Sequence, residues 1–306
     1  RTTQADAIFD GLATVKGKAD SKGLMWALGN NRRALGILAT TADGKQYYEL
    51  DKEMNLIAKE DTETAEYIED KFAVPSDVIN IEENSVLIVD QKGRRWRLPL
   101  GDERYKEKIE KAELRICREV STERDLFSCF GTFYELPAEN ADGFAKIRPV
   151  SSHKFAINDY ASYRGMMMLT GIEHAKAKGN PHIVISEDGK AAVWAGAIDD
   201  LWKLGKPVGH GGPWLETEVK AREKSDPFLI GFYDKREMTL SHAASSEVVF
   251  TVEVDPTGDG QWFKYADFEV KPGASFKHKF PKAFQARWIR VSTNVDTKAT
   301  VNFEYR

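Results

Sequence analysis

The chain has 306 residues, of which 42% are apolar and 11% aromatic, so it is long enough for two domains with buried cores. Acidic and basic side chains are interleaved and the net charge is -4, which leaves no long-range positive field to attract a nucleic acid. The longest apolar run falls well short of the roughly 18 to 20 residues of a membrane-spanning helix, so no membrane span is expected.

Strand-turn-strand units recur along the first two thirds of the chain, each with a glycine-containing turn between runs of alternating apolar and polar residues. The turns are Asp43-Gly44, Lys92-Gly93, Asp188-Gly189 and, more weakly, Asp142-Gly143. Asp-Gly favours a hairpin because glycine adopts the positive φ of the turn without steric cost. Glycines 44, 93, 143 and 189 are 49, 50 and 46 residues apart. A strand-based period of about 40 to 50 residues is typical of β-propeller blades.

Residues 1–204 are therefore predicted to form about four propeller blades, which is close to the smallest number that can close a ring. Either the propeller is small or blades are missing before residue 1, and the start at Arg1 without an initiator methionine favours missing blades of the same protein. Coincidental spacing of turns in a β-rich chain is the alternative. Residues 102–118 are rich in glutamate and lysine and are expected to form an inserted, solvated helix.

The pattern changes after residue 204. Residues 205–224 hold several glycines and prolines and are predicted to be a linker or a long rim loop. Apolar and polar residues alternate in short runs over residues 225–306. Strands are expected over 237–242, 247–254, 262–270, 275–280, 286–292 and 299–305. About seven short strands in roughly 80 residues are typical of a β-sandwich. The predicted fold is thus all-β: a partial or small β-propeller followed by a C-terminal β-sandwich.

The two cysteines, Cys117 and Cys129, are twelve residues apart. They lack the CxxC spacing of a metal site, and one pair in a large chain is no disulfide framework. Two buried thiols are favoured over a disulfide, and cysteine usage leaves the cellular compartment open.

Three segments, 129–150 (CFGTFYELPAENADGFAKIRPV), 159–171 (DYASYRGMMMLTG) and 192–214 (AVWAGAIDDLWKLGKPVGHGGPW), resemble the C-terminal half of an uncharacterised family of large secreted proteins of Bacteroidetes and planctomycetes. The resemblance continues through Ser225-Asp226-Pro227 and the strand at 286–291. It implies a secreted or periplasmic protein. More loosely, the chain is similar to propeller enzymes, hydrolases and lyases, that act on rhamnose linked to glucuronic acid. That second likeness concerns the fold and assigns no chemistry.

Residues 153–165 concentrate the side chains that recognise acidic sugars. Sugar rings stack on aromatic faces, and the arginine fork matches a uronate carboxylate. His153 is the candidate general acid or base, with Asp159 as the carboxylate that orients it and Tyr160 as a proton donor. The remaining candidates for substrate binding in and near this segment are Tyr163, Arg164 and Arg148. The alternative is a loop histidine beside an Asx turn, with Arg164 in a structural salt bridge.

Two further residues are candidates for substrate binding. Trp194 lies in AVWAGAIDDLW, where it lines a channel or, in the favoured interpretation, packs one blade on the next. His210 lies among glycines that let a backbone approach a ligand or make a mobile linker. Arg95 and Arg97 share one strand face that meets an acidic glycan or, more simply, the solvent. No zinc spacing, calcium loop or nucleotide motif occurs, so no metal or cofactor is expected.

Two functions follow as hypotheses. The first is a secreted glycoside hydrolase or polysaccharide lyase that acts on an acidic glycan at the propeller mouth. The second is a non-catalytic glycan-binding or scaffolding protein, which the absence of a diagnostic catalytic motif favours. In both hypotheses the partner is a carbohydrate, with uronate as the candidate acidic sugar.

Overall fold

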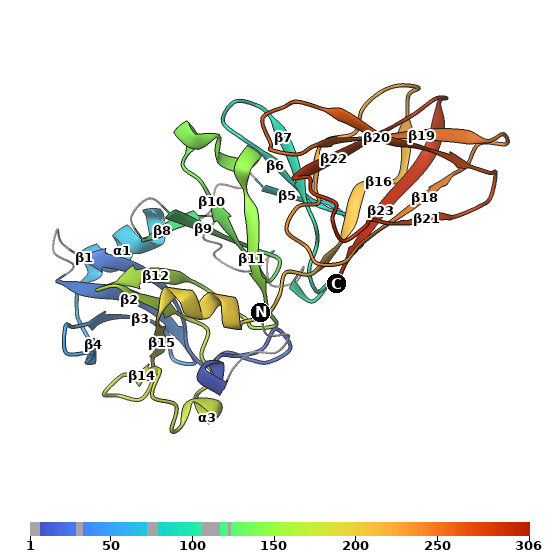
Figure 1. Ribbon diagram of the computed structural model, residues 1–306. Coiled ribbons are helices and arrows are strands. Elements are labelled where there is room, and N and C mark those ends of the chain that lie inside the picture. The colour runs from blue at the N-terminus through green and yellow to red at the C-terminus, as the bar shows by residue number, and fades with distance from the viewer. Residues whose placement is uncertain (1–6, 29–32, 72–78, 106–116, 122–123) are drawn as a thin grey trace. The chain divides into compact units, whose positions relative to one another are not determined.

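The computed structural model describes residues 7–28, 33–71, 79–105, 117–121 and 124–306 (Figure 1). The chain divides into two compact units. The first unit contains residues 1–74, 102–136 and 150–206, and the second contains 75–101, 137–149 and 207–306. Strands predominate in both units, which confirms the all-β class. Within the described residues, no helix has the length and apolar character needed to cross a membrane.

The first sheet of the first unit is an antiparallel meander of four strands in chain order. Its strands are β1 (Lys22–Leu28), β2 (Ala34–Thr41), β3 (Gly44–Leu50) and β4 (Leu56–Ala58). Gly44 closes the β2–β3 hairpin at φ 116°, a backbone conformation that glycine adopts without strain. Helix α1 (Thr62–Lys71) covers one face, where Ile68 packs against Leu24, Leu38 and Tyr47.

Two more four-stranded sheets complete the first unit. The second sheet has the order β11-β10-β9-β8, and the third has the order β12-β13-β15-β14. The strands are β8 (Cys117–Ser121), β9 (Arg124–Cys129), β10 (Thr132–Leu136), β11 (Arg148–Ser152), β12 (Tyr160–Tyr163), β13 (Met166–Leu169), β14 (Ile183–Ile185) and β15 (Ala192–Gly196). The short helices are η1 (Ala7–Phe9), α3 (His174–Ala177) and η4 (Ile198–Lys203). Each sheet has the size of a propeller blade; the ring itself stays a prediction.

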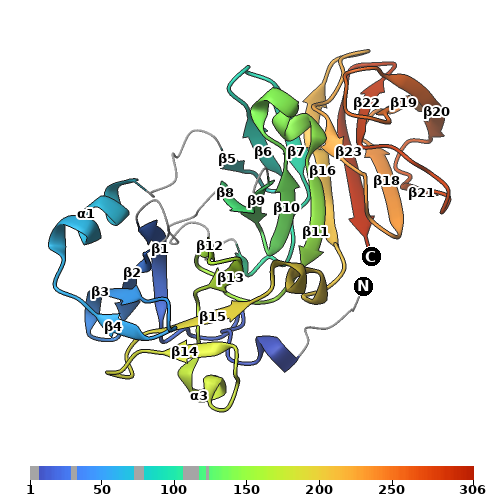
Figure 2. The same ribbon diagram turned by 60° about the vertical axis from the view of Figure 1, so that its left-hand side comes forward.

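The third sheet buries both of its faces, because neighbouring side chains on its strands point in opposite directions. Met168 and Val193 pack with Ile37 and Tyr48 of the first sheet. The strands of the first and third sheets can be followed in Figure 2. Met167 and Trp194 belong to a second cluster that includes Phe133 and Val150 of the second sheet. The hydrophobic core of the first unit therefore consists of two layers, one on each side of the third sheet.

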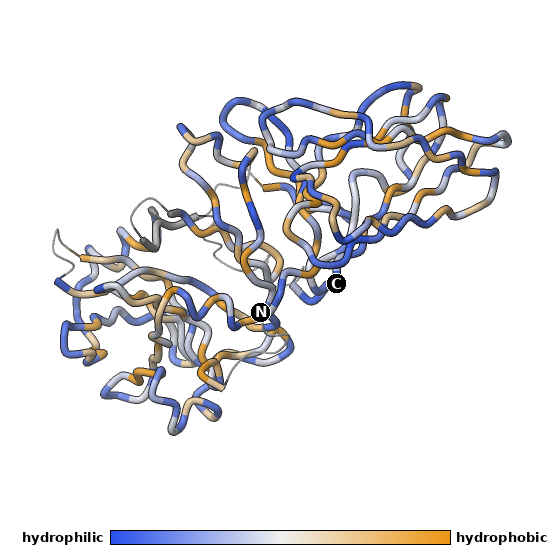
Figure 3. The backbone as a smooth tube through the Cα atoms, viewed as in Figure 1, coloured by the Kyte–Doolittle hydropathy of each residue, from blue (hydrophilic) through white to orange (hydrophobic). Residues whose placement is uncertain are grey.

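The second unit is built on two sheets. A four-stranded sheet has the order β16-β23-β18-β21, and a seven-stranded sheet has the order β20-β19-β22-β17-β7-β6-β5. The strands are β5 (Ile79–Ile81), β6 (Val86–Val89), β7 (Arg95–Leu98), β16 (Gly209–Val219), β17 (Phe228–Leu229), β18 (Arg236–His242), β19 (Val248–Asp255), β20 (Phe263–Val270), β21 (Phe276–Lys279), β22 (Trp288–Thr293) and β23 (Thr297–Tyr305). Their alternating hydropathy is visible along the tube in Figure 3.

Side chains from the two sheets of the second unit contact each other. The rings of Phe228 (β17) and Phe303 (β23) are stacked with their centroids 5.1 Å apart. The Tyr305 hydroxyl donates to the Leu229 carbonyl oxygen at 2.8 Å. The strands predicted between residues 237 and 305 are present within two residues of their expected ends. The β-sandwich stays a prediction for this part of the chain.

Two segments of the second unit come from the part of the sequence that was predicted to form blades. The hairpin at Lys92-Gly93 is confirmed, but its strands β6 and β7 extend the seven-stranded sheet, where β7 pairs with β17 in parallel. Residues 137–149 fold into η2 (Glu139–Ala141) and η3 (Gly143–Lys146), so Gly143 lies in a short helix and not in the predicted hairpin turn. Hairpins at Gly44 and Gly189 are confirmed.

Residues 205–224 were predicted to be a linker or a long rim loop. In the structure, Gly209–Val219 form strand β16, which pairs with β23. Two glycines of this strand allow neighbouring backbone segments to approach closely. A Cβ atom at Gly211 would lie 2.1 Å from the Asn84 carbonyl oxygen, and one at Gly212 would lie 1.9 Å from that of Val301. The helix predicted at residues 102–118 falls mostly outside the described residues, and the boundaries drawn at 204 and 224 stay a prediction.

Candidate functional site

His153, the candidate acid or base, is a buried residue of the first unit with 8% of its surface exposed. Its Nδ1 atom accepts the Phe155 backbone N–H at 3.2 Å, which places the proton of the neutral ring on Nε2. The Nε2 atom is buried and has no hydrogen-bond partner among the described residues. Burial lowers the pKa of His153 to about 4. The ring is therefore neutral at pH 7 and presents a donor, not a base, at Nε2.

Asp159 and Tyr160 are also buried in the first unit, and their polar atoms bind backbone groups. The Asp159 carboxylate accepts the N–H of Met25 at 2.7 Å and that of Tyr160 at 2.8 Å. The Tyr160 hydroxyl donates to the Leu126 carbonyl oxygen at 2.8 Å. His153 and Tyr160 both pack against the Phe133 ring. These contacts hold β12 in place, and the catalytic role of the three residues stays a prediction.

Tyr163, Arg164 and Trp194 occupy three different environments in the first unit. Tyr163 is buried, and burial raises its pKa. Arg164 is exposed in the β12–β13 turn, at φ 50°. Trp194 is fully buried and lies against the Phe9 and His182 rings, with its Nε1 atom donating to the Ile8 carbonyl oxygen at 2.7 Å. These placements give Trp194 a packing role and leave only Arg164 of the three accessible to a ligand.

Arg148 and His210 belong to the second unit. Arg148 is exposed and is the first residue of β11, whose residues from 150 onward belong to the first unit. His210 is half-buried in β16, and its backbone exchanges two hydrogen bonds with Leu100, at 2.9 and 2.8 Å. The predicted site residues are therefore divided between the two units, and their role in substrate binding stays a prediction.

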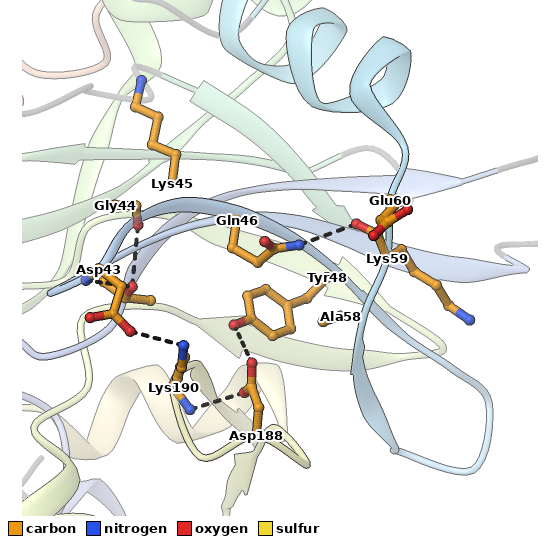
Figure 4. A pocket seen from close by; sticks show the side chains of 11 residues that line it. Asp43, Gly44, Lys45, Gln46, Tyr48, Ala58, Lys59, Glu60, Asp188 and Lys190 are labelled. Carbon is orange, nitrogen blue, oxygen red and sulfur yellow. Dashed lines mark hydrogen bonds and ion pairs between the residues drawn. The ribbon is translucent and has the colours of Figure 1, made fainter.

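A polar pocket of about 330 Å³ lies in the first unit between two hairpins (Figure 4). The β2–β3 hairpin supplies Asp43, Lys45, Gln46 and Tyr48, and the β14–β15 hairpin supplies Asp188 and Lys190. Lys59 and Glu60 follow β4 and complete the wall. Tyr48 and Asp188 are 140 positions apart in the sequence and meet at 2.9 Å, so packing of the first sheet on the third forms the pocket.

The Asp188 carboxylate accepts three hydrogen bonds from within the chain. It accepts the Tyr48 hydroxyl at 2.9 Å, the Ser186 hydroxyl at 2.5 Å and the Lys190 backbone N–H at 3.0 Å. Partial burial opposes ionisation, but these hydrogen bonds outweigh it and lower the pKa of Asp188. Burial, followed by the contact with Asp188, raises the pKa of Tyr48. Asp188 thus stays ionised and fixes the turn, which suits a structural anchor better than a general acid.

The other polar groups around the pocket are arranged for binding. Gln46 donates its amide N–H groups to the carbonyl oxygens of Tyr47 and Lys59, at 3.1 and 3.2 Å. Both of its N–H groups are therefore used within the chain. Lys190 pairs with Asp43 at 2.9 Å, and this pairing raises the pKa of Lys190. Three lysines and three carboxylates line the pocket, so its charge is balanced. Such a lining suits a hydroxyl-rich ligand better than a polyanion.

Sequence reasoning named Asp43 and Asp188 only as turn residues and missed Gln46, Lys59 and Glu60. The two Asp-Gly turns were the available signal, since each predicted a hairpin end that carries exposed polar side chains. Nothing in the spacing along the chain indicates that these two ends lie together.

Two minor expectations concern the cysteines and the pair of arginines on β7. Cys129 is a buried free thiol, and the Cys117 side chain lies outside the described residues. Arg95 and Arg97 do share a face, where both bind the Asp226 carboxylate at 3.0 and 2.8 Å. In the part of the chain that the structure describes, no three histidine, cysteine or acidic side chains are grouped as metal ligands.

No family model and no curated protein matches the chain. Among solved structures, a glycoside hydrolase is similar at a TM-score of 0.19 and 12% identity, covering 92% of this chain and 84% of that chain. A Bombyx mori GH32 β-fructofuranosidase mutant in complex with sucrose is similar at a TM-score of 0.16 and 9% identity, covering 93% and 75%. Likeness of this degree supports no argument about fold or function.

Proposed function

We propose that the chain belongs to a carbohydrate-active protein and that the pocket beside Tyr48 binds a saccharide. The observation that carries this proposal is the lining of the pocket. Its amide, carboxylate and ammonium groups offer both donors and acceptors with no net charge, and internal hydrogen bonds hold Tyr48, Asp188 and Gln46 in position. Sugar hydroxyls both donate and accept, so they match such a lining. A volume of about 330 Å³ lies at the lower end of small-molecule pockets.

The pocket favours binding over catalysis. Hydrolysis of a glycosidic bond needs two carboxyl groups, one of them held protonated by a raised pKa. Asp188 has the opposite arrangement, because its hydrogen bonds lower its pKa. The chemistry of the pocket therefore supports a glycan-binding protein without catalytic activity. A glycoside hydrolase or polysaccharide lyase remains the alternative drawn from the sequence, with His153, Asp159 and Tyr160 as its candidate residues.

The location and the wider context of the chain belong to the same proposal. We propose a secreted or periplasmic location and an acidic glycan as partner on the basis of the family resemblance. Additional blades before residue 1 are proposed on the basis of the repeat pattern. Two exposed arginines, Arg148 and Arg164, offer charge for a uronate on the second and first units respectively.

Binding to the pocket is tested with the Gln46→Leu variant, which keeps the side-chain volume and removes the amide. Calorimetric titration of the full chain with a panel of neutral oligosaccharides should detect a ligand whose affinity falls about tenfold in the variant, or about 1.4 kcal/mol. Gln91→Leu, an exposed glutamine of the second unit, is the matched control and should bind as the parent does.

Two outcomes contradict the proposal. In one, no saccharide of the panel binds the parent chain at millimolar concentration. In the other, a saccharide binds with equal affinity to the parent and to the Gln46→Leu variant, which would place binding elsewhere. Product release in the same mixtures, analysed by chromatography, decides between binding alone and the enzyme alternative.

A further inference from the structure

We propose that the outer face of the four-stranded sheet in the second unit binds an acidic glycan. The lysines of its edge strand β21 attract the carboxylates, and polar side chains of β18 and β23 bind the hydroxyls. The ligand class rests on the proposed function, but this face lies in the other unit and shares no residue with the pocket beside Tyr48. Ammonium groups pair with carboxylates, and amide and hydroxyl groups match sugar hydroxyls, which both donate and accept.

Alternation along β21 places its lysines and its rings on opposite faces of the sheet. The side chains of Lys277 and Lys279 are 67% and 84% exposed, whereas Phe276 and His278 are half-buried. The two lysines therefore lie on the outer face, about 7 Å apart along the strand. Within the sheet, β21 pairs on one side only, with β18 (Figure 1). The lysines thus mark one border of the outer face.

Little negative charge lies near these lysines to compensate them. Glu237 is 3.8 Å from both Lys277 and Lys279, so two ammonium groups share one carboxylate. Residues 271–282 hold two further lysines and no acidic residue. Both of these lysines are exposed, and neither forms an ion pair with another described residue. The edge of the sheet is therefore positive, although the net charge of the chain is -4.

Two polar side chains continue the surface from Lys277 across the sheet. Lys277 is opposite Thr239 on β18, and Thr239 is opposite Asn302 on β23. The residues on either side of Thr239 and of Asn302 are fully buried, so these two side chains point to the outer face. Neither side chain forms a hydrogen bond with another described residue. Neighbouring strands are about 4.8 Å apart, so an ammonium, a hydroxyl and an amide form a row roughly 10 Å long.

The opposite face of β21 holds the strand in place. The ring centroids of Phe276 and His278 lie 5.1 and 4.9 Å from that of Phe268 on β20. A hydrogen bond of 2.9 Å joins the Tyr265 hydroxyl to Nε2 of His278. These contacts fix the backbone that carries the lysines. A ligand therefore binds to a strand that is already ordered, which limits the entropy lost on binding.

Lysines on an edge strand also discourage pairing with the edge of another sheet. That role requires charge on β21 alone. It does not involve Thr239 or Asn302, which lie on the two inner strands of the sheet. Thr239→Val therefore separates the two roles, because valine keeps the shape of the side chain and favours a strand but lacks the hydroxyl.

The test measures binding of oligogalacturonides to the full chain by calorimetric titration, with the same oligosaccharides methyl-esterified as the neutral probe. In Lys277→Gln/Lys279→Gln, affinity for the acidic probe should fall about tenfold, or about 1.4 kcal/mol, toward that for the esterified probe. Thr239→Val should weaken binding of the acidic probe about threefold, as loss of one neutral hydrogen bond does. Lys92→Gln/Lys220→Gln, which removes two exposed lysines elsewhere on the same unit, is the matched control and should bind as the parent does.

Several results would overturn this inference. They are equal affinity of the parent for acidic and esterified probes, an equal loss in the lysine variant and its control, unchanged affinity in Thr239→Val, and equally tight binding of single-stranded DNA, which would indicate a non-specific polyanion surface. The Gln46→Leu variant separates the two proposals. If it loses neutral saccharides while the lysine variant binds the acidic probe as the parent does, the pocket stands and this surface fails. If Gln46→Leu has no effect while the lysine variant loses the acidic probe, the surface stands and the pocket fails.

Discussion

Lowering the pH from 7 to 5 is expected to destabilise the first unit through His153. The imidazole is buried among the rings of Tyr105, Phe133 and Phe155, with centroid distances of 6.1, 5.3 and 6.2 Å. No described residue accepts a hydrogen bond from Nε2. A charge on this ring would therefore be buried without compensation, and burial lowers the pKa of His153 from 6.5 to about 4.

The direction and size of the effect follow from the two pKa values. The unfolded chain takes up a proton near pH 6.5, whereas the folded ring stays neutral until about pH 4. Stability from this group is therefore complete above pH 6.5 and is lost as the pH falls toward 4. At pH 5 the unfolded chain is favoured by about 1.5 pK units, which lowers the unfolding free energy by about 2 kcal/mol. Below pH 4 the loss levels off at about 3.4 kcal/mol.

Urea denaturation of the full chain at pH 7, 6 and 5 measures this loss, with His153→Phe as the variant that cannot titrate. Between pH 7 and 5, the unfolding free energy of the variant should fall by about 2 kcal/mol less than that of the parent. His278 in the second unit also has a pKa lowered by burial, so both proteins are compared in a His278→Gln background. Equal slopes for parent and variant would refute the reasoning, because they would mean that the ring is solvated or paired.

Two further changes test the contacts that hold the first unit. Asp159→Asn replaces an oxygen that accepts a backbone N–H by an amide donor, so unfolding free energy should fall by about 2–4 kcal/mol in urea titration, and an unchanged midpoint would contradict the structural role. Gly171→Ala puts a Cβ atom 2.2 Å from the Ala156 carbonyl oxygen at φ 101°, so its melting temperature should drop well below that of Gly189→Ala, which has a positive φ but open space. Similar melting temperatures for the two alanine variants would disprove the close approach.

Local features of the fold could be predicted from the sequence because they depend on neighbouring residues. The strand expected at 237–242 is Arg236–His242, and the one expected at 247–254 is Val248–Asp255. Side-chain alternation and turn glycines specify such elements. They do not specify the partner of an edge strand. The Lys92-Gly93 hairpin was predicted correctly, yet β7 pairs with β17, whose Phe228 lies 131 positions after Arg97.

The candidate site was harder to predict because its residues are defined by contacts distant in sequence. Asp159 was chosen as a polar residue near a histidine, but its carboxylate binds the backbone of Met25, 134 positions earlier. His210 was chosen for its glycine neighbours. Those glycines allow the backbones of Asn84 and Val301 to approach, an interpretation that needs the positions of the β5–β6 turn and of β23. The pocket beside Tyr48 depends in the same way on two hairpins at opposite ends of the first unit's sequence.

The alternation of apolar and polar residues within 225–306 does not by itself account for the core of the second unit. Trp288 is fully buried, and its Nε1 atom donates to the Ala145 carbonyl oxygen at 2.8 Å, while its ring lies 4.7 Å from that of Trp96. Arg97 binds Asp226 at 2.8 Å. Residues from 75–101 and 137–149 thus cover the side chains that residues 225–306 would otherwise expose. The Lys146 carbonyl oxygen of the second of these segments also accepts a hydrogen bond from the Arg287 guanidinium, so this segment is held to the strand that follows Arg287 by side-chain as well as ring contacts.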